Sequence, residues 1–262
     1  MLTCLKPLLV RAIDRLPYRL TFILQRKYYL RKLRNISSDA DQDLSVIPQL
    51  VVEGDSVIDI GANYGLWTRF LAESTGKNGK VLAIEPVPRT YDILKYCVVS
   101  LGIGNIETLH AAVSDQDGKA TISVPDYRGR VNYYRASLDN RHQRKSPHSF
   151  EVRTFSVDTL VTRYHGLAAP SFIKCDVEGH ELAVVNGAKL VVEKSLPSWL
   201  IELGSHPDED GTDANQIKRY FESVGYSDYV FADGKFTPRK EGETSVNYIF
   251  IHESRLQGLR LG

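Results

Sequence analysis

A glycine-rich turn between an apolar strand and a helix is the feature that most constrains the fold of this chain. The run Val57-Ile-Asp-Ile60 predicts a buried strand, and Gly61-Ala-Asn-Tyr-Gly65 leads from it directly into a helical pattern. Glycine allows a positive φ at such a turn and lets a ligand approach the backbone closely. A second apolar strand, Lys80–Ile84, is followed by Glu85, whose carboxylate suits the two hydroxyls of a ribose. The sequence therefore predicts an α/β fold that binds a nucleoside.

Short apolar runs alternate with helical patterns across residues 44–254. This alternation predicts a mostly parallel sheet with helices on both faces, and a ligand at the carboxyl ends of its central strands. With 42% hydrophobic and 25% charged residues, a chain of 262 residues can bury one sizeable core. Cys4, Cys97 and Cys175 are widely spaced and odd in number, which argues against a disulfide framework and favours a reducing, cytoplasmic compartment.

We expect three parts along the chain. Residues 1–43 form a basic helical extension, residues 44–254 form the main domain, and residues 255–262 form a tail. Within the domain, residues 126–150 are an insertion rich in arginine and tyrosine. Such a loop beside a ligand site is either an acceptor-binding lid or a solvated hairpin.

The glycine turn lacks the pattern G-x-G-x-x-G and a phosphate-binding lysine, so neither a dinucleotide nor a nucleoside triphosphate is favoured. Its pattern D-x-G-x-N-x-G instead resembles the first motif of methyltransferases that use S-adenosylmethionine (SAM). The resemblance implies that Asp59 lies near the amino group of the methionine moiety and that Glu85 binds the ribose. The residues expected to bind SAM, with the last of them near the adenine, are Asp59, Gly61, Asn63, Gly65, Glu85 and Asp115.

A second motif follows a later apolar strand and reads Phe172-Ile-Lys-Cys-Asp-Val-Glu-Gly-His-Glu-Leu182, with one long helix expected over about residues 180–194. Together the two motifs resemble the FkbM family of methyltransferases, whose hallmark is a strand that ends in D-x-E-G-x-E. The similarity covers roughly residues 50–204. It implies a Rossmann-like class I methyltransferase fold with a seven-stranded, mostly parallel sheet. It also implies methyl transfer to a hydroxyl of a sugar, glycolipid or polyketide-type acceptor.

Three carboxylates lie close together after the second-motif strand. Such a cluster is costly unless it is used, so we assign Asp176, Glu178 and Glu181 to catalysis. Asp176 is expected to take the proton of the acceptor hydroxyl, with the two glutamates orienting the acceptor. Two alternatives stay open: Mg²⁺ held by two or three of the acids, which is not favoured, and a simple capping role for Glu181. His180 is interpreted as an exposed residue beside this cluster rather than as a base. Glu202 could equally be a surface acid or a further member of the acidic cluster.

Two rival functions are weighed against methyl transfer. A non-catalytic binding protein would keep the nucleoside pocket without the chemistry. An NAD-linked epimerase would share the architecture, but the chain has no G-x-G-x-x-G pattern. Turnover of a methyl-labelled cofactor separates these functions.

The charges of the chain are unevenly distributed. Residues 1–35 contain nine basic side chains and one acid, and the remaining residues carry a net charge of −7. Because this first segment also bears apolar residues at roughly helical spacing, we expect one of three roles for it. It contacts the cytoplasmic face of an anionic membrane, packs on the acidic body, or forms a dimer contact. The acidic body argues against nucleic acid as a partner and leaves a small-molecule or glycan acceptor.

Overall fold

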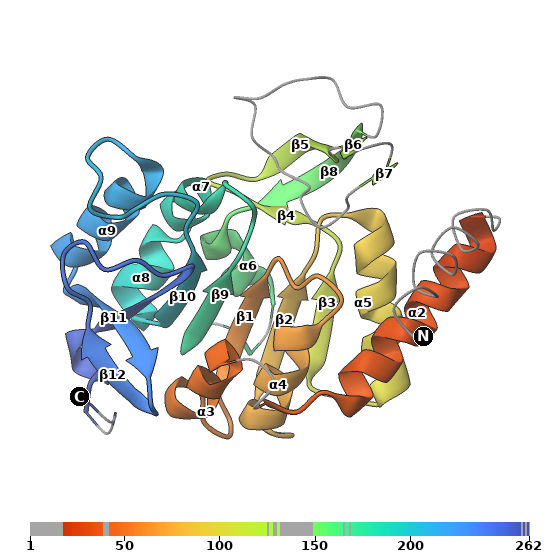
Figure 1. Ribbon diagram of the computed structural model, residues 1–262, viewed down its shortest axis with the longest axis horizontal. Coiled ribbons are helices and arrows are strands. Elements are labelled where there is room, and N and C mark those ends of the chain that lie inside the picture. Colours follow the sequence, from red (N-terminus) through yellow and green to blue (C-terminus); the bar gives the residue numbers. More distant parts are fainter. Residues whose placement is uncertain are drawn as a thin grey trace, which may run out of the picture.

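A computed structural model places an eight-stranded sheet between two layers of helices (Figure 1). The structure describes residues 18–38, 42–124, 126–127, 130–131, 149–164, 166–167, 169–257, 259 and 261. The strand order is β12-β11-β13-β10-β9-β1-β2-β3. The bounds of these strands are β1 Ser56–Ile60, β2 Lys80–Ile84, β3 Ile106–Leu109, β9 Phe172–Cys175, β10 Ser198–Glu202, β11 Tyr226–Ala232, β12 Lys235–Pro238 and β13 Asn247–His252.

The neighbouring strands β10, β9, β1, β2 and β3 run parallel, and β13, β11 and β12 add an antiparallel end to the sheet. The predicted fold class is confirmed, but the sheet has one strand more than the seven expected. The additional strand, β12, pairs with β11 through the two-residue turn Asp233-Gly234, in which both residues have a positive φ. A turn of this kind matches the twist of the two strands it joins.

Helices cover both faces of the sheet. One face carries α6, α7, α8 and α9, and the other carries α3, α4 and α5, with α2 outside α5 (Figure 1). The helix bounds are α2 Tyr18–Asn35, α3 Ile47–Leu50, α4 Leu66–Thr75, α5 Pro88–Leu101, α6 Val157–Arg163, α7 Glu181–Asn186, α8 Lys189–Ser195 and α9 Asp213–Ser223, and two short 3-10 helices span Gln42–Val46 and Glu253–Arg255. The central strands are buried on both sides, as parallel strands between helices must be.

The prediction of one long helix over residues 180–194 is wrong, because this segment forms two shorter helices, α7 and α8. The break lies at Gly187, where an added Cβ would be 2.1 Å from the carbonyl oxygen of Ser114. Backbone from a distant segment therefore occupies the space that a side chain would need. The local apolar spacing contains no information about that contact.

Helix α2 is part of the folded body. Its Leu30 and Leu33 pack in one cluster with Ile93 and Cys97 of α5. Packing on the body, one of the roles expected for the basic extension, is therefore seen for α2, whereas residues 1–17 lie outside the described chain. Among the described residues, no helix is both long enough and apolar enough to cross a bilayer.

A smaller sheet with the strand order β4-β8-β5 lies beside the main one. Its bounds are β4 Ala112–Val113, β5 Gly118–Ser123 and β8 Ser149–Phe155. Within the predicted insertion, strands β6 (Asp126–Tyr127) and β7 (Arg130–Val131) pair antiparallel. Most of the remaining insertion lies outside the described residues, so its role as a lid stays a prediction.

Candidate active site

A cleft opens at the carboxyl ends of β1, β2 and β9. The register places Ile60 of β1 beside Ile84 of β2 and Cys175 of β9, so the residues that follow these strands meet at one edge. Residues that line the cleft include Gly61, Asn63, Glu85, Asp176 and Glu178. The two sequence motifs thus come together at the switch point of the sheet, where α/β folds bind their ligands.

The glycine turn lies directly against the end of β9. Gly61 has φ 76°, and a Cβ built on it would lie 1.8 Å from the carbonyl oxygen of Asp176. Only glycine fits this position, because any side chain would collide with backbone. Asn63 also has a positive φ, and Gly65, with φ 96°, directly precedes α4. The turn is therefore fixed against the strand that carries the second motif.

Glu85 is buried in the cleft wall, with only 5% of its surface exposed. Its Oε2 accepts the backbone N–H of Asn63 at 2.9 Å, and its Oε1 accepts that of Val87 at 3.0 Å. Burial raises the pKa of Glu85 to about 7, although the two N–H donors oppose this rise. Each oxygen retains a second lone pair, so the carboxylate can also accept hydrogen bonds from ligand hydroxyls.

Asp59 lies beneath the turn and is fully buried. Its Oδ2 accepts the hydroxyl of Thr68 at 2.6 Å, whereas its Oδ1 has no hydrogen-bond partner. Burial raises the pKa of Asp59, against the opposing effects of the Lys174 ammonium and Thr68. Asp59 is not among the residues that line the cleft, so its contact with a methionine amino group stays a prediction.

Lys174 joins the two motifs, and its role was not predicted from the sequence. Its side chain is 5% exposed, and Nζ donates to the carbonyl oxygen of Gly61 at 3.0 Å and to Oδ2 of Asp176 at 3.2 Å. Oδ1 of Asp59 lies 3.8 Å from the same nitrogen. Burial alone would lower the pKa of Lys174, but the carboxylates of Asp176 and Asp59 outweigh it and raise the pKa. The available signal was a lysine inside an apolar strand, since a buried lysine requires partners.

The three acids of the second motif occupy two kinds of position. Asp176 and Glu178 line the cleft, and Glu178 has φ 56°, a rare conformation for a residue of its kind. Glu181 is buried instead, at the start of α7, where its Oε1 accepts the backbone N–H groups of Val177 and Gly179. Burial raises the pKa of Glu181. The Glu181 side chain therefore holds the loop that follows β9.

Glu202, at the end of β10, lies near enough to Asp176 and Glu178 to feel their charges, and we call these three acids the acidic rim. Burial, followed by the charges of Asp176 and Glu178, raises the pKa of Glu202 to about 7. Among the described residues, no three His, Cys, Asp or Glu side chains are placed to hold a metal ion. The rim thus combines an acid paired with a lysine, Asp176, and an acid that titrates near neutral pH, Glu202.

Asp115 and His180 lie in a separate hollow. The hydroxyl of Ser114 donates to Oδ1 of Asp115 at 3.0 Å, and Oγ of Ser114 also lies 2.9 Å from Nε2 of His180. Asp115, His180, Asn186 and Asp213 help to line this hollow, and none of them lines the main cleft. The structure therefore does not bring Asp115 together with Glu85.

A parallel sheet with this glycine turn, a buried acid after the next strand and an open cleft at the switch point defines a SAM-dependent methyltransferase of class I. Residues 59–227 match the methyltransferase FkbM domain. The chain belongs to the FkbM family of methyltransferases.

Several known proteins are similar to this chain. It is 26% identical over 200 residues to the hexuronic acid methyltransferase AglP of Haloferax volcanii, and this match covers 76% of this chain and 76% of AglP. It is 23% identical over 206 residues to the methyltransferase sdnD of Sordaria araneosa, covering 69% of this chain and 75% of sdnD. The crystal structure of an FkbM methyltransferase from Methylobacillus flagellatus KT matches with a TM-score of 0.50 and 13% identity, over 88% of this chain and 60% of that one. This last likeness supports the fold alone.

Proposed function

We propose that this chain transfers the methyl group of SAM to a hydroxyl of a sugar, glycolipid or polyketide-type acceptor. The observation that carries the proposal is the cleft, which is lined by Glu85 and the Gly61 turn together with Asp176 and Glu178. The similarity to a hexuronic acid methyltransferase supports an acceptor of the sugar class.

The residues of the cleft fit SAM. Glu85 is held in place by two backbone N–H groups and keeps lone pairs for the ribose hydroxyls. The side-chain oxygen of Asn63 is buried and has no hydrogen-bond partner, although Asn63 lines the cleft. A buried acceptor without a donor is costly, and a ligand N–H or O–H would remove that cost. SAM supplies an activated methyl group on a sulfonium.

The chain's own residues align and deprotonate the acceptor. Holding the acceptor oxygen in line with the methyl group supplies much of the acceleration. As the new C–O bond forms and the C–S bond breaks, the hydroxyl proton passes to a carboxylate of the rim, for which Asp176 is the first candidate. Glu178 orients the acceptor, and Glu181 acts by holding the loop that carries Glu178. We further propose Asp59 as a weaker contact to SAM, whereas Asp115, which lies in the separate hollow, is left out of the proposed site.

Label transfer tests the proposed function. The purified chain is incubated with methyl-labelled SAM and separately with methyl glucuronide, methyl glucoside, a glycolipid extract and a macrolide. We expect labelled product from at least one of these acceptors, with the label in an alkali-stable ether. A chain that binds SAM in calorimetry but labels none of them would contradict the proposal and favour a non-catalytic binding protein.

SAM affinity is expected to depend on pH through Glu85. The ribose hydroxyls require the ionised carboxylate, so affinity should fall about tenfold per pH unit below the raised pKa of about 7. The stability of the folded chain without SAM depends on pH in the opposite direction. Because folding raises the pKa of Glu85, protonation of this carboxyl stabilises the folded state at a pH below its ordinary pKa. This contribution to stability is lost as the pH rises through about 7.

Calorimetric titration with SAM from about pH 5.5 to about pH 8, a range that spans the Glu85 pKa of about 7, checks this prediction. Glu85→Gln should weaken binding roughly 10-fold or more at pH 8 and flatten the pH dependence. Glu53→Gln, which changes an exposed glutamate near the other end of β1, is the matched control and should keep the wild-type profile. An unchanged affinity in Glu85→Gln, with the fold intact, would refute the role of Glu85.

A further inference from the structure

The outward face of α2 exposes apolar side chains that the fold does not use. Leu20, Ile23 and Leu24 are each 47% exposed, and Tyr28 is 62% exposed. The opposite face of the same helix packs against α5 through Leu30 and Leu33. Helix α2 is thus apolar on two sides, and the part of the chain that the structure describes packs against only one of them.

Basic side chains continue the same stripe. Residues three and four positions apart share one side of a helix. The outward stripe, which recurs at that spacing, consists of Leu20, Ile23, Leu24, Lys27, Tyr28 and Arg31. The exposed Arg19 and Arg34 lie toward its two ends, and the chain has no acidic residue from Arg15 to Ser38. The uncovered face therefore combines large apolar groups with unopposed positive charge.

The helix that carries this face is attached to a wall of the cleft. Arg89, in the first turn of α5, donates from Nε and Nη2 to the side-chain oxygen of Gln25 at 3.0 and 2.8 Å. Val87 and Thr90, on either side of Arg89, line the cleft. The N-terminal half of α2 is therefore tied to the segment that forms one wall of the SAM site, as the neighbouring ribbons of α2 and α5 show (Figure 1).

We propose that the outward face of α2 binds the surface of an anionic lipid bilayer. An interfacial helix places apolar side chains among the acyl chains and basic side chains beside the lipid phosphates. A second copy of this helix fits the face poorly, because two such stripes would bring like charges together. Nucleic acid would satisfy the charges but would leave Leu20, Ile23 and Leu24 in water. A bilayer satisfies both, and it would hold the cleft close to an acceptor that is itself a glycolipid.

Flotation of the full chain with vesicles tests the proposal. We expect the chain to float with phosphatidylcholine vesicles that contain about one third phosphatidylglycerol, to stay behind with pure phosphatidylcholine, and to be released by about 0.5 M salt. Lys27→Glu combined with Arg31→Glu should lower the bound fraction at least about tenfold, since both charges reverse at the membrane surface. Leu20→Ser combined with Leu24→Ser should also lower it severalfold.

Two double variants, each with one position in α8 and one beside or within the strands β12 and β13, serve as matched controls. Lys189→Glu with Lys235→Glu repeats the charge change, and Leu190→Ser with Val246→Ser repeats the apolar change at exposed positions. Both should float like the wild type, and calorimetry should show unchanged SAM binding in all four variants.

Three results would overturn the proposal. The wild-type chain stays behind with anionic vesicles at low salt; the control variants lose binding as much as the α2 variants do; or added RNA displaces the chain while the Leu20 and Leu24 variant floats normally. The last result would make this face a polyanion site instead. None of these measurements depends on methyl transfer, so they stand or fall independently of the proposed reaction.

Discussion

Replacing Asp176 with asparagine is expected to reduce turnover roughly 10²- to 10⁴-fold, the usual contribution of a positioned general base. Asparagine keeps the shape of the side chain, and its oxygen can still accept the Lys174 Nζ donor that now lies at 3.2 Å. The contact between Gly61 and the Asp176 carbonyl involves only backbone and is unaffected. SAM affinity should therefore stay within about threefold of the wild type, so the loss appears in kcat.

Single-turnover transfer from labelled SAM, with an acceptor found in the screen, measures this loss, and calorimetry measures SAM binding. Asp92→Asn, the same substitution at an exposed position of α5, is the control and should keep full turnover. EDTA should leave the wild-type rate unchanged, and a loss of activity in EDTA would favour the magnesium alternative. Near-normal turnover in Asp176→Asn would refute its role as the base. Glu202, whose pKa is raised to about 7, would then be the acid to replace.

The parts of this molecule that were predicted from sequence are those set by local patterns. The strand before Gly61 is mostly apolar, apart from Ser56 and Asp59, because helices cover both of its faces. Gly61 and Gly65 mark the turn because a positive φ is required there. Parallel strands end at one edge, so Glu85 and Asp176 were expected to meet without knowledge of the full topology.

The parts that were not predicted depend on contacts between distant segments. Lys174 acquires its role only when β1 and β9 pair, because its partners Asp59 and Gly61 lie more than a hundred residues away in the chain. Asp115 follows the strand β4, yet its side chain lies in a different hollow from Glu85. Glu181 was expected at the acceptor because it belongs to the motif, but its carboxylate turns back to the backbone of its own loop.

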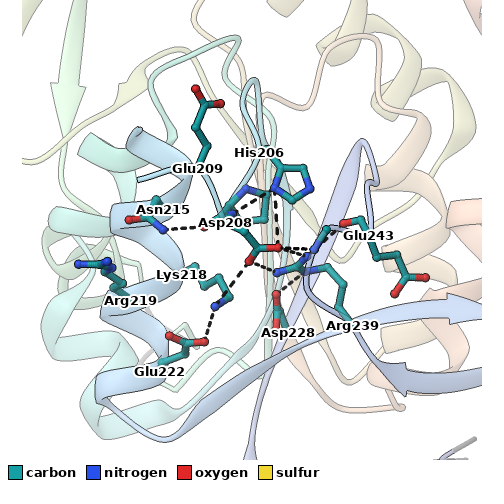
Figure 2. A network of polar contacts seen from close by, with 12 residues as sticks. His206, Asp208, Glu209, Asn215, Lys218, Arg219, Glu222, Asp228, Arg239 and Glu243 are labelled. Carbon is teal, nitrogen blue, oxygen red and sulfur yellow. Dashed lines mark hydrogen bonds and ion pairs between the residues drawn. The ribbon is translucent and has the colours of Figure 1, made fainter. Parts of the chain in front are cut away.

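A cluster of charges at the antiparallel end of the sheet was also beyond local patterns. Arg239, with 1% of its side chain exposed, donates from Nη2 and Nη1 to Asp208 at 2.6 and 2.8 Å and from Nε to Asp228 at 2.6 Å (Figure 2). Nζ of Lys218, in α9, lies 3.7 Å from Oδ1 of Asp208. Hydrogen bonds from Arg239 hold the pKa of Asp208 well below its usual range. This network ties the loop that follows Glu202 to β11 and to the segment before β13.

Replacing Arg239 with alanine is expected to lower the free energy of unfolding by about 3–5 kcal/mol, since it leaves two carboxylates without their buried partner. Urea unfolding measures the change. Arg219→Ala is the matched control, because the ion pair of Arg219 with Asp210 is exposed and its loss should cost no more than about 1 kcal/mol.

The pH dependence of stability adds a second check. The lowered pKa of Asp208 contributes stability above its ordinary value of 3.8, which is lost as the pH falls toward the folded-state pKa. Arg239→Ala should therefore show a shallower loss of stability in acid than the wild type, and equal costs for the two arginine variants would show that the network does not hold the loop beside Glu202.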